Sequence, residues 1–188
     1  MSDEKNILVV DCQYDFIDGT LACEFADEAV KNIVALINSN PDAKIYYSLD
    51  WHNPEHCSFV NNGGTWPVHC VAKTHGAELH KIFYNEIKNP EQRPNENNMY
   101  FKGCNNDVEE YSAFDAKNKS GHALNQDIKS NELTVVGIAS EFCVKESILA
   151  FMNAGKKIKF VKNCVAYVNS DGHAKNLQEL SARGVVIA

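Results

Sequence analysis

Six short apolar runs, separated by helical or polar segments, are the feature that most limits how this chain can fold. The runs are nearly continuous in branched and aromatic residues, which is typical of parallel strands buried on both faces. The predicted strands are 7–10, 44–49, 99–102, 133–138, 158–161 and 185–187. The pattern therefore predicts a three-layer α/β/α protein with a mostly parallel six-stranded sheet between two helical layers.

Helices are predicted between these strands from apolar positions three or four residues apart. Two of them are expected to begin at capping residues, Asp27 and Ser120. Three others are expected over 77–83, 142–153 and 173–182. The connection that follows the second strand is long and irregular, and loops of that kind are often functional.

Composition excludes several classes of function. The 188 residues contain no internal repeat or linker, so one domain over 1–188 is predicted. A net charge of −7 without a long basic cluster argues against nucleic-acid binding. No apolar run approaches the ~20 residues of a membrane helix or forms a signal peptide. The seven cysteines include no C-x-x-C pair, so a reducing cytoplasm is expected.

Reactive side chains collect where the predicted strands end. The first strand ends at Asp11, the second at Asp50, the third at Lys102, and Cys143 follows the fourth. Ligands of parallel α/β sheets bind at the carboxyl ends of the strands. We therefore expect these four side chains to lie together at one edge of the sheet.

A candidate metal site lies within this group. Asp50 and His52 alternate by two, so both can point from one face of an extended segment. His69 returns to the same place after a loop containing Gly63 and Gly64. A carboxylate and two neutral imidazoles can hold zinc, iron or manganese and leave positions open for water or substrate. The alternative is a pair of surface histidines beside a loop.

The other three residues suggest nucleophilic catalysis. Cys143 is the candidate nucleophile, and a helix amino terminus with a nearby lysine is expected to favour its thiolate. Asp11 is the candidate base, because burial raises the proton affinity of a carboxylate. Lys102 would hold the pair together electrostatically. The alternatives are a buried structural cysteine, a turn aspartate and a surface lysine.

These residues stand in segments that resemble the isochorismatase-like cysteine hydrolases, and within them the nicotinamidase/pyrazinamidase family. The resemblance covers nearly the whole chain, in the order of the family. The matching segments are 10–16, 50–59, 65–71, 101–103, 111–114 and 136–144. The resemblance implies an isochorismatase-like fold and hydrolysis of nicotinamide to nicotinic acid and ammonia through a thioester, in salvage toward NAD. Pyrazinamide-like amides are plausible further substrates, and a homo-oligomer is left open.

The resemblance also implies roles for the reactive residues. Asp11, Lys102 and Cys143 would form the catalytic triad. The metal ligands would be Asp50, His52 and His69, holding one divalent ion, with zinc as the first choice and iron or manganese as alternatives. Whether His56 is a fourth ligand or a loop residue is left open.

The substrate pocket can be assigned in the same way. Phe16 and Trp66 match aromatic residues that sandwich the pyridine ring, and Tyr111 either lines the pocket or packs beneath the loop. The bond before Ala139 matches a cis peptide of the family. The backbone N–H groups of Ala139 and Cys143 would form the oxyanion hole.

One departure from the family and three alternative functions remain. Ser140-Glu141 stands where the family commonly has Thr-Asp. The first alternative is a cysteine amidohydrolase of the same superfamily that acts on another small amide. The second is a noncatalytic metal-binding or partner-binding domain, and the third is an isochorismate hydrolase, whose vinyl-ether chemistry would not need Cys143.

Overall fold

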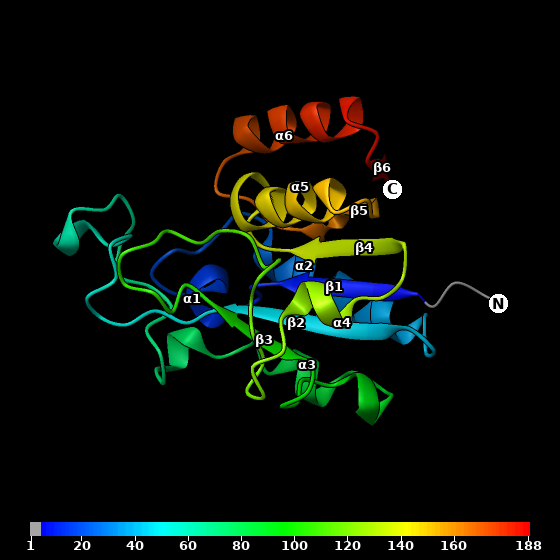
Figure 1. The fold of residues 1–188 in the computed structure, drawn as a ribbon, viewed down its shortest axis with the longest axis horizontal. Helices are drawn as coiled ribbons and strands as arrows, with labels where there is room; N and C mark the ends of the chain where they lie inside the picture. Colours follow the sequence, from blue (N-terminus) through cyan, green and yellow to red (C-terminus); the bar gives the residue numbers. More distant parts are fainter. Residues whose placement is uncertain (1–4) are drawn as a thin grey trace.

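The structure, a computed structural model, describes residues 5–188, so the first four residues of the predicted domain lie outside the described part. Six strands form one sheet in the order β3-β2-β1-β4-β5-β6 (Figure 1). Every pairing between neighbouring strands is parallel. The strands are β1 (Asn6–Val10), β2 (Lys44–Asp50), β3 (Met99–Lys102), β4 (Glu132–Gly137), β5 (Lys157–Val165) and β6 (Val186–Ile187). The predicted fold class is confirmed.

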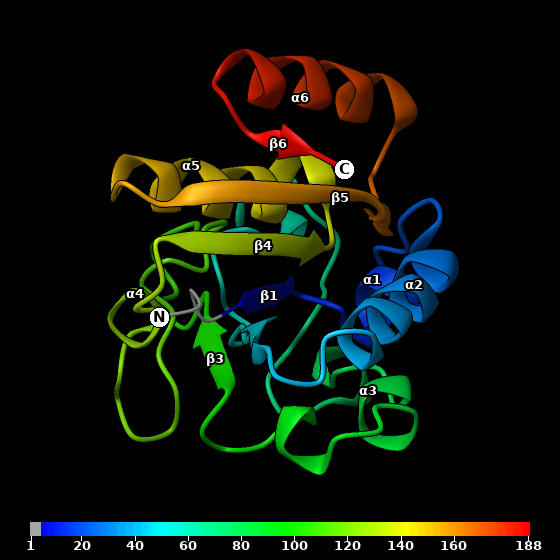
Figure 2. The same ribbon diagram turned by 90° about the vertical axis from the view of Figure 1, so that its right-hand side faces the viewer.

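Helices cover both faces of the sheet (Figure 2). Apolar side chains form one core on each face. Successive residues of β1 point to opposite faces of the sheet. Ile7 and Val9 therefore belong to one core, and Leu8 and Val10 to the other. The first core includes α1 (Tyr14–Ile17), α2 (Ala26–Asn38) and α3 (Ile82–Asn85). The second includes α4 (Leu124–Asp127), α5 (Lys145–Asn153) and α6 (Ser170–Ala182). No helix in the described residues is long and apolar enough to cross a membrane.

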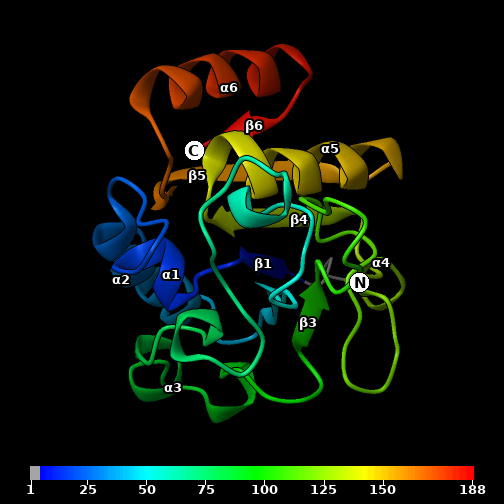
Figure 3. The same ribbon diagram turned by 90° about the vertical axis from the view of Figure 1, so that its left-hand side faces the viewer.

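The order of the strands places a crevice beside β1. The chain runs outward from β1 to β2 and β3, then returns to the other side of β1 with β4. Such a reversal opens a ligand site at the carboxyl ends of the strands. Figure 3 faces these ends and shows the segment after β2 crossing in front of them.

Several predicted helices were wrong in extent. The helix predicted over 77–83 is replaced by a 3-10 turn, His75–Ala77, and the short α3, because Leu79 pairs with Gln13 in an antiparallel bridge. The helix expected from Ser120 shrinks to α4, since the next residue, Gly121, turns the chain with φ +82°.

Other boundaries differ for reasons of packing. Asp27 lies in the first turn of α2 rather than at its cap, which is Phe25, because the helix already begins at the buried Ala26. The helix predicted from Phe142 is a π-helical turn, η4 (Ser140–Val144), followed by α5. β5 continues beyond its predicted end, and α6 begins before its predicted start.

Candidate active site and metal centre

Three neighbouring strands deliver the charged residues of the site. Asp11 follows β1, Asp50 ends β2 and Lys102 ends β3, and the last two are paired in the strand register. Cys143 lies in η4, beyond β4. Asp11 is 0% exposed, Lys102 3% and Cys143 6%, so the group is withdrawn from solvent. The expected convergence at one edge of the sheet is confirmed.

Lys102 is the centre of this group. Its Nζ lies 2.9 Å from Oδ2 of Asp11 and 3.4 Å from Sγ of Cys143. It also makes an ion pair with Oδ1 of Asp50. Ser48 donates its hydroxyl hydrogen to the other Asp11 oxygen at 2.6 Å. The lysine therefore links the candidate nucleophile and base to the first metal-ligand candidate.

Burial is the largest single influence on the pKa values of Asp11 and Lys102. It raises the pKa of Asp11, although the Lys102 ammonium opposes the shift, so the expectation of a carboxylate with raised proton affinity is confirmed. Burial would lower the pKa of Lys102, but the Asp11 and Asp50 carboxylates outweigh it and raise that pKa well above its usual value. Lys102 is therefore an ammonium ion.

The expectation that the surroundings of Cys143 would favour its thiolate was wrong. Burial raises the pKa of the Cys143 thiol well above its ordinary value; Lys102 lowers it, but Asp11 and Asp50 raise it further. Two buried carboxylates and one ammonium surround the sulfur, so the local charge does not favour a further negative charge. The thiol is thus protonated at rest, beside a carboxylate that can accept its proton.

The two imidazoles are oriented for metal binding. Nδ1 of His52 lies 2.9 Å from the carbonyl oxygen of Gly103, and Nδ1 of His69 lies 2.7 Å from that of Pro67. A carbonyl oxygen only accepts hydrogen bonds, so Nδ1 carries a hydrogen in both rings, and in the neutral rings Nε2 keeps its lone pair. These Nε2 atoms lie 3.5 and 4.0 Å from Oδ2 of Asp50.

This donor set fits a divalent cation. The ligand atoms of Asp50, His52 and His69 lie within 4.8 Å of one another, and all three residues are buried. Nε2 of His52 has no hydrogen-bond partner among the described residues. A buried lone pair of this kind is costly unless something binds it, and two imidazoles with a carboxylate suit zinc, iron or manganese.

His56 lies beside this set. Its ring centroid is 4.1 Å from that of His52, and its Nδ1 accepts a hydrogen bond from the backbone N–H of Ser58 at 3.2 Å. A neutral imidazole that accepts at Nδ1 carries its hydrogen at Nε2, and that form does not bind a metal through Nε2. The role of His56 as a fourth ligand stays a prediction, and this hydrogen bond disfavours it.

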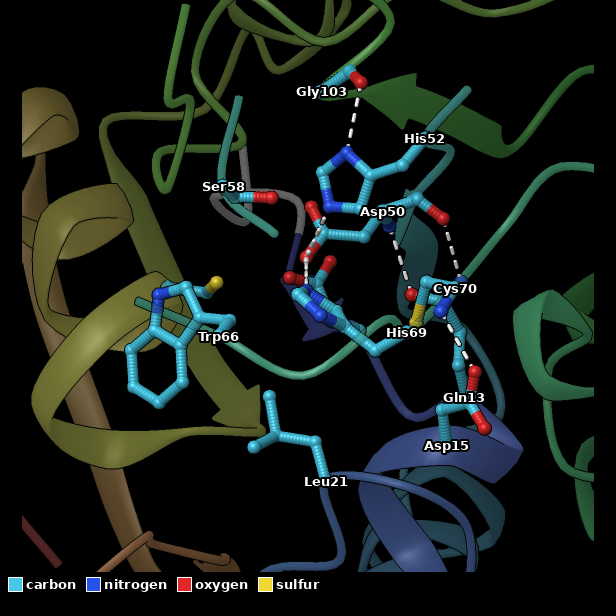
Figure 4. A network of polar contacts seen from close by, with 12 residues as sticks. Gln13, Asp15, Leu21, Asp50, His52, Ser58, Trp66, His69, Cys70 and Gly103 are labelled. Carbon is cyan, nitrogen blue, oxygen red and sulfur yellow. Dashed lines mark hydrogen bonds and ion pairs between the residues drawn. The ribbon is translucent and has the colours of Figure 1, made fainter. Parts of the chain in front are cut away.

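Two side chains from the segment after β1 hold the backbone at Asp50 and beside His69 in place (Figure 4). Gln13 accepts the backbone N–H of Asp50 at 2.8 Å and donates to the Asp50 and Ala77 carbonyls at 2.7 and 2.8 Å. Asp15 accepts the backbone N–H of Cys70, next to His69, at 2.7 Å. Cys70 has φ 47°, an uncommon value for a residue with a side chain.

A small pocket opens onto these groups. Trp66 donates its indole N–H to Tyr111 at 2.9 Å and packs edge-on against Phe142, with ring centroids 4.9 Å apart. The lining residues are Phe16, Leu21, Cys23, Asp50, Trp66, His69, Glu109, Tyr111, Ala139, Phe142, Cys143 and Val168. A wider groove outside β3 shares Glu109 and Tyr111 but contains none of Asp50, His69 and Cys143.

The pocket includes the three residues expected to bind substrate, Phe16, Trp66 and Tyr111. Leu21, Phe142 and Val168 also line the pocket and were not predicted from the sequence. An apolar residue gives no local signal that it faces a pocket rather than the core. The peptide bond between Ile138 and Ala139 is cis, as the resemblance implied.

Comparisons with known proteins agree with this geometry. A family model described as the Isochorismatase domain matches residues 5–188. The nicotinamidase of Escherichia coli is 29% identical over 207 residues, which cover 97% of this chain and 93% of that protein.

Solved structures give the same result. The pyrazinamidase of Pyrococcus horikoshii in complex with zinc aligns with a TM-score of 0.84 at 28% identity, covering 98% of each chain. The yeast nicotinamidase Pnc1p bound to the inhibitor nicotinaldehyde aligns with a TM-score of 0.82 at 26% identity, covering 98% of this chain and 99% of that one. Because the family model spans all the described residues, the chain belongs to the isochorismatase family.

Proposed function

We propose that this protein is a metal-containing cysteine amidohydrolase that converts nicotinamide to nicotinic acid and ammonia. One observation carries the proposal: Cys143, Asp11 and Lys102 meet in a buried cluster that shares Asp50 with a ready-made set of metal ligands. The nicotinamidases among the relatives support the amidohydrolase assignment. Pyrazinamide-like amides fit the same chemistry, and the reaction would serve salvage of the pyridine ring toward NAD.

Asp50, His52 and His69 would hold the metal ion. Zinc suits this donor set, and the Pyrococcus horikoshii relative was solved in complex with zinc. A bound divalent ion supplies a Lewis acid that orients substrate and positions water. Phe16 and Trp66 would hold the flat ring between them, with Tyr111 fixing Trp66 through its hydrogen bond.

The first half of the reaction makes a thioester. Asp11 takes the proton from the Cys143 thiol while the sulfur attacks the carboxamide carbon. The carbonyl oxygen becomes an oxyanion, held by the backbone N–H groups of Ala139 and Cys143, each worth about 3 kcal/mol in comparable sites. The carbon–nitrogen bond then breaks, and Asp11 returns its proton to the leaving nitrogen, which departs as ammonia.

The second half regenerates the thiol. Asp11 removes a proton from water as the water oxygen attacks the thioester carbon. The carbon–sulfur bond breaks, nicotinic acid is released, and the sulfur recovers its proton from Asp11. Lys102 stabilises each negative charge in turn, because its ammonium lies beside both the sulfur and the Asp11 carboxylate.

The test is ammonia release from purified protein with nicotinamide, pyrazinamide, benzamide and an aliphatic amide, with and without a chelator. We expect nicotinamide to be turned over with the highest kcat/KM, chelation to lower the rate, and added zinc to restore it. No ammonia from nicotinamide, with turnover of another amide, would favour the alternative of a different small-amide hydrolase.

A further inference from the structure

Glu141 connects the turn that carries the candidate nucleophile to a distant segment of the chain. It stands two residues before Cys143 in η4, and one oxygen of its carboxylate, Oε1, accepts the backbone N–H groups of Val168 and Asn169, both at 2.9 Å. Those two residues join β5 to α6. A single carboxylate oxygen thus binds two consecutive amides of the connection.

Val168 forms part of the pocket wall. It lines the same cavity as Phe16, Leu21, Trp66 and Cys143. The amide of Val168 is therefore bound by Glu141 in a residue that lines the substrate space. A hydrogen bond from the nucleophile turn itself is thus one of the contacts that set the position of this wall relative to the sulfur.

Capping of α6 does not account for Glu141. The helix already has a cap, because Asn169 Oδ1 accepts the backbone N–H of Gly172 at 2.7 Å. The second oxygen of Glu141 is buried without a hydrogen-bond partner in the described part of the chain. A partly desolvated carboxylate is costly unless its hydrogen bonds are strong, so the two amides of the connection are its main stabilising partners.

A separate set of contacts fixes the turn. The backbone N–H of Ser140 donates to Ala166 at 2.8 Å, and the Ser140 carbonyl accepts from the Asn176 amide at 2.6 Å. The Ser140 hydroxyl lies 2.8 Å from Nδ1 of His173. Ser140 is fully buried. Removing Glu141 would therefore leave the turn anchored through Ser140, while the Val168 amide would lose its partner and the chain beside it would stay held by the bridge between Tyr167 and Glu24.

We infer that Glu141 is a specificity-determining positioning residue that sets the Val168 wall of the pocket, an inference that rests on the proposed amidohydrolase function. The wall limits the width available to the substrate ring. Loss of the carboxylate should weaken binding of a small flat amide and reduce discrimination against wider ones, with little change in the attack by Cys143.

The first test compares Glu141→Ala, Glu141→Gln and Glu179→Ala. We expect Glu141→Ala to raise KM for nicotinamide on the order of tenfold, since hydrogen bonds to charged groups are the stronger ones, with kcat changed by less than about threefold. Glu141→Gln keeps an oxygen acceptor and should recover most of the KM. Glu179→Ala removes a carboxylate that pairs α6 with Lys145 of α5 at 2.6 Å, away from the pocket, and should leave KM unchanged. A loss in kcat alone would overturn the inference.

A double-mutant cycle tests whether Glu141 changes KM through its contact with Val168. If Glu141 acts through the wall, Glu141→Ala should raise KM by less than about twofold in a Val168→Ala background, because contacting residues are not additive. The full increase in both backgrounds would show that Glu141 acts elsewhere and would overturn the assignment.

Alkylation of Cys143 measures how wide a reagent the Val168 wall admits to the sulfur, and it does not depend on amidase turnover. Iodoacetamide and the wider N-phenylmaleimide are compared by mass spectrometry of the Cys143 peptide. The ratio of the wide to the narrow reagent should rise about tenfold in Glu141→Ala but not in Glu141→Gln, and an unchanged ratio in both would contradict the inference. If the wild-type protein hydrolyses no nicotinamide, the proposed function fails, but this ratio still tests the wall.

Discussion

The main chain of Gly103 lies directly against the imidazole ring of His52. A β-carbon at position 103 would come within 2.4 Å of Cε1 of His52, and the carbonyl of Gly103 accepts the Nδ1 hydrogen of the same ring. Gly103 also has φ +65°, a conformation that residues with a side chain rarely adopt. Gly103 thus orients a metal-ligand candidate and leaves it the space to lie there.

We predict that Gly103→Ala will weaken zinc binding by about 10- to 100-fold, the range usual for loss of a group that orients a metal ligand. The measurement is a zinc titration of chelator-treated protein. Gly121→Ala is the matched control, because Gly121 also has positive φ, +82°, but a β-carbon added there would meet nothing within 4 Å. Wild-type affinity in Gly103→Ala would remove His52 from the ligand set.

Gln13 should matter for both stability and metal affinity. Gln13→Ala leaves the backbone N–H and carbonyl of Asp50 buried without their partners, so we expect a loss of about 3 kcal/mol in the free energy of unfolding. Gln13→Glu keeps the acceptor but loses the donor and should also weaken zinc binding. Chemical denaturation and zinc titration measure the two effects. Gln126→Ala, at an exposed position, should alter neither; equal stability of Gln13→Ala and this control would contradict the prediction.

Lys102→Met should abolish ammonia release and destabilise the fold. It leaves two buried carboxylates, Asp11 and Asp50, without their cation, and breaking a buried ion pair in this way costs about 3–5 kcal/mol. Lys119→Met removes an exposed pair with Glu96 and should leave the free energy of unfolding nearly unchanged. A Lys102 variant that retains turnover would show that the ammonium is not needed at the sulfur.

The Cys143 thiol should titrate above the ordinary cysteine pKa of about 8.5 in chelator-treated protein, because burial and two carboxylates outweigh Lys102. The rate of Cys143 alkylation should therefore remain low at neutral pH and rise only in the alkaline range. Alkylation against pH, followed on the Cys143 peptide, measures this. A rate that levels off below pH 7 would mean that Lys102 dominates and that the thiolate is preformed.

The parallel sheet and the site at its edge could be predicted because both follow from local patterns. Apolar runs identify the strands, and Asp11, Asp50 and Lys102 stand where those runs end. The helix predicted over 77–83 failed because Leu79 pairs with Gln13, a contact between segments far apart in the chain.

The charge state of Cys143 could not be predicted for a similar reason. Its pKa depends on the balance of burial and three surrounding charges, which exists only once the chain is folded. Likewise, no local pattern indicates that Glu141 binds the amide of Val168 or that Gly103 contacts His52.

The most direct test of the account is ammonia release from nicotinamide by Cys143→Ala, measured beside the wild-type protein and Cys104→Ala, which alters an exposed cysteine. We predict that Cys143→Ala will release no ammonia above background while keeping its fold by circular dichroism and its zinc stoichiometry, and that Cys104→Ala will match the wild-type rate. Turnover by a folded Cys143→Ala variant at a rate near that of the wild type would contradict the assignment of this sulfur as the nucleophile.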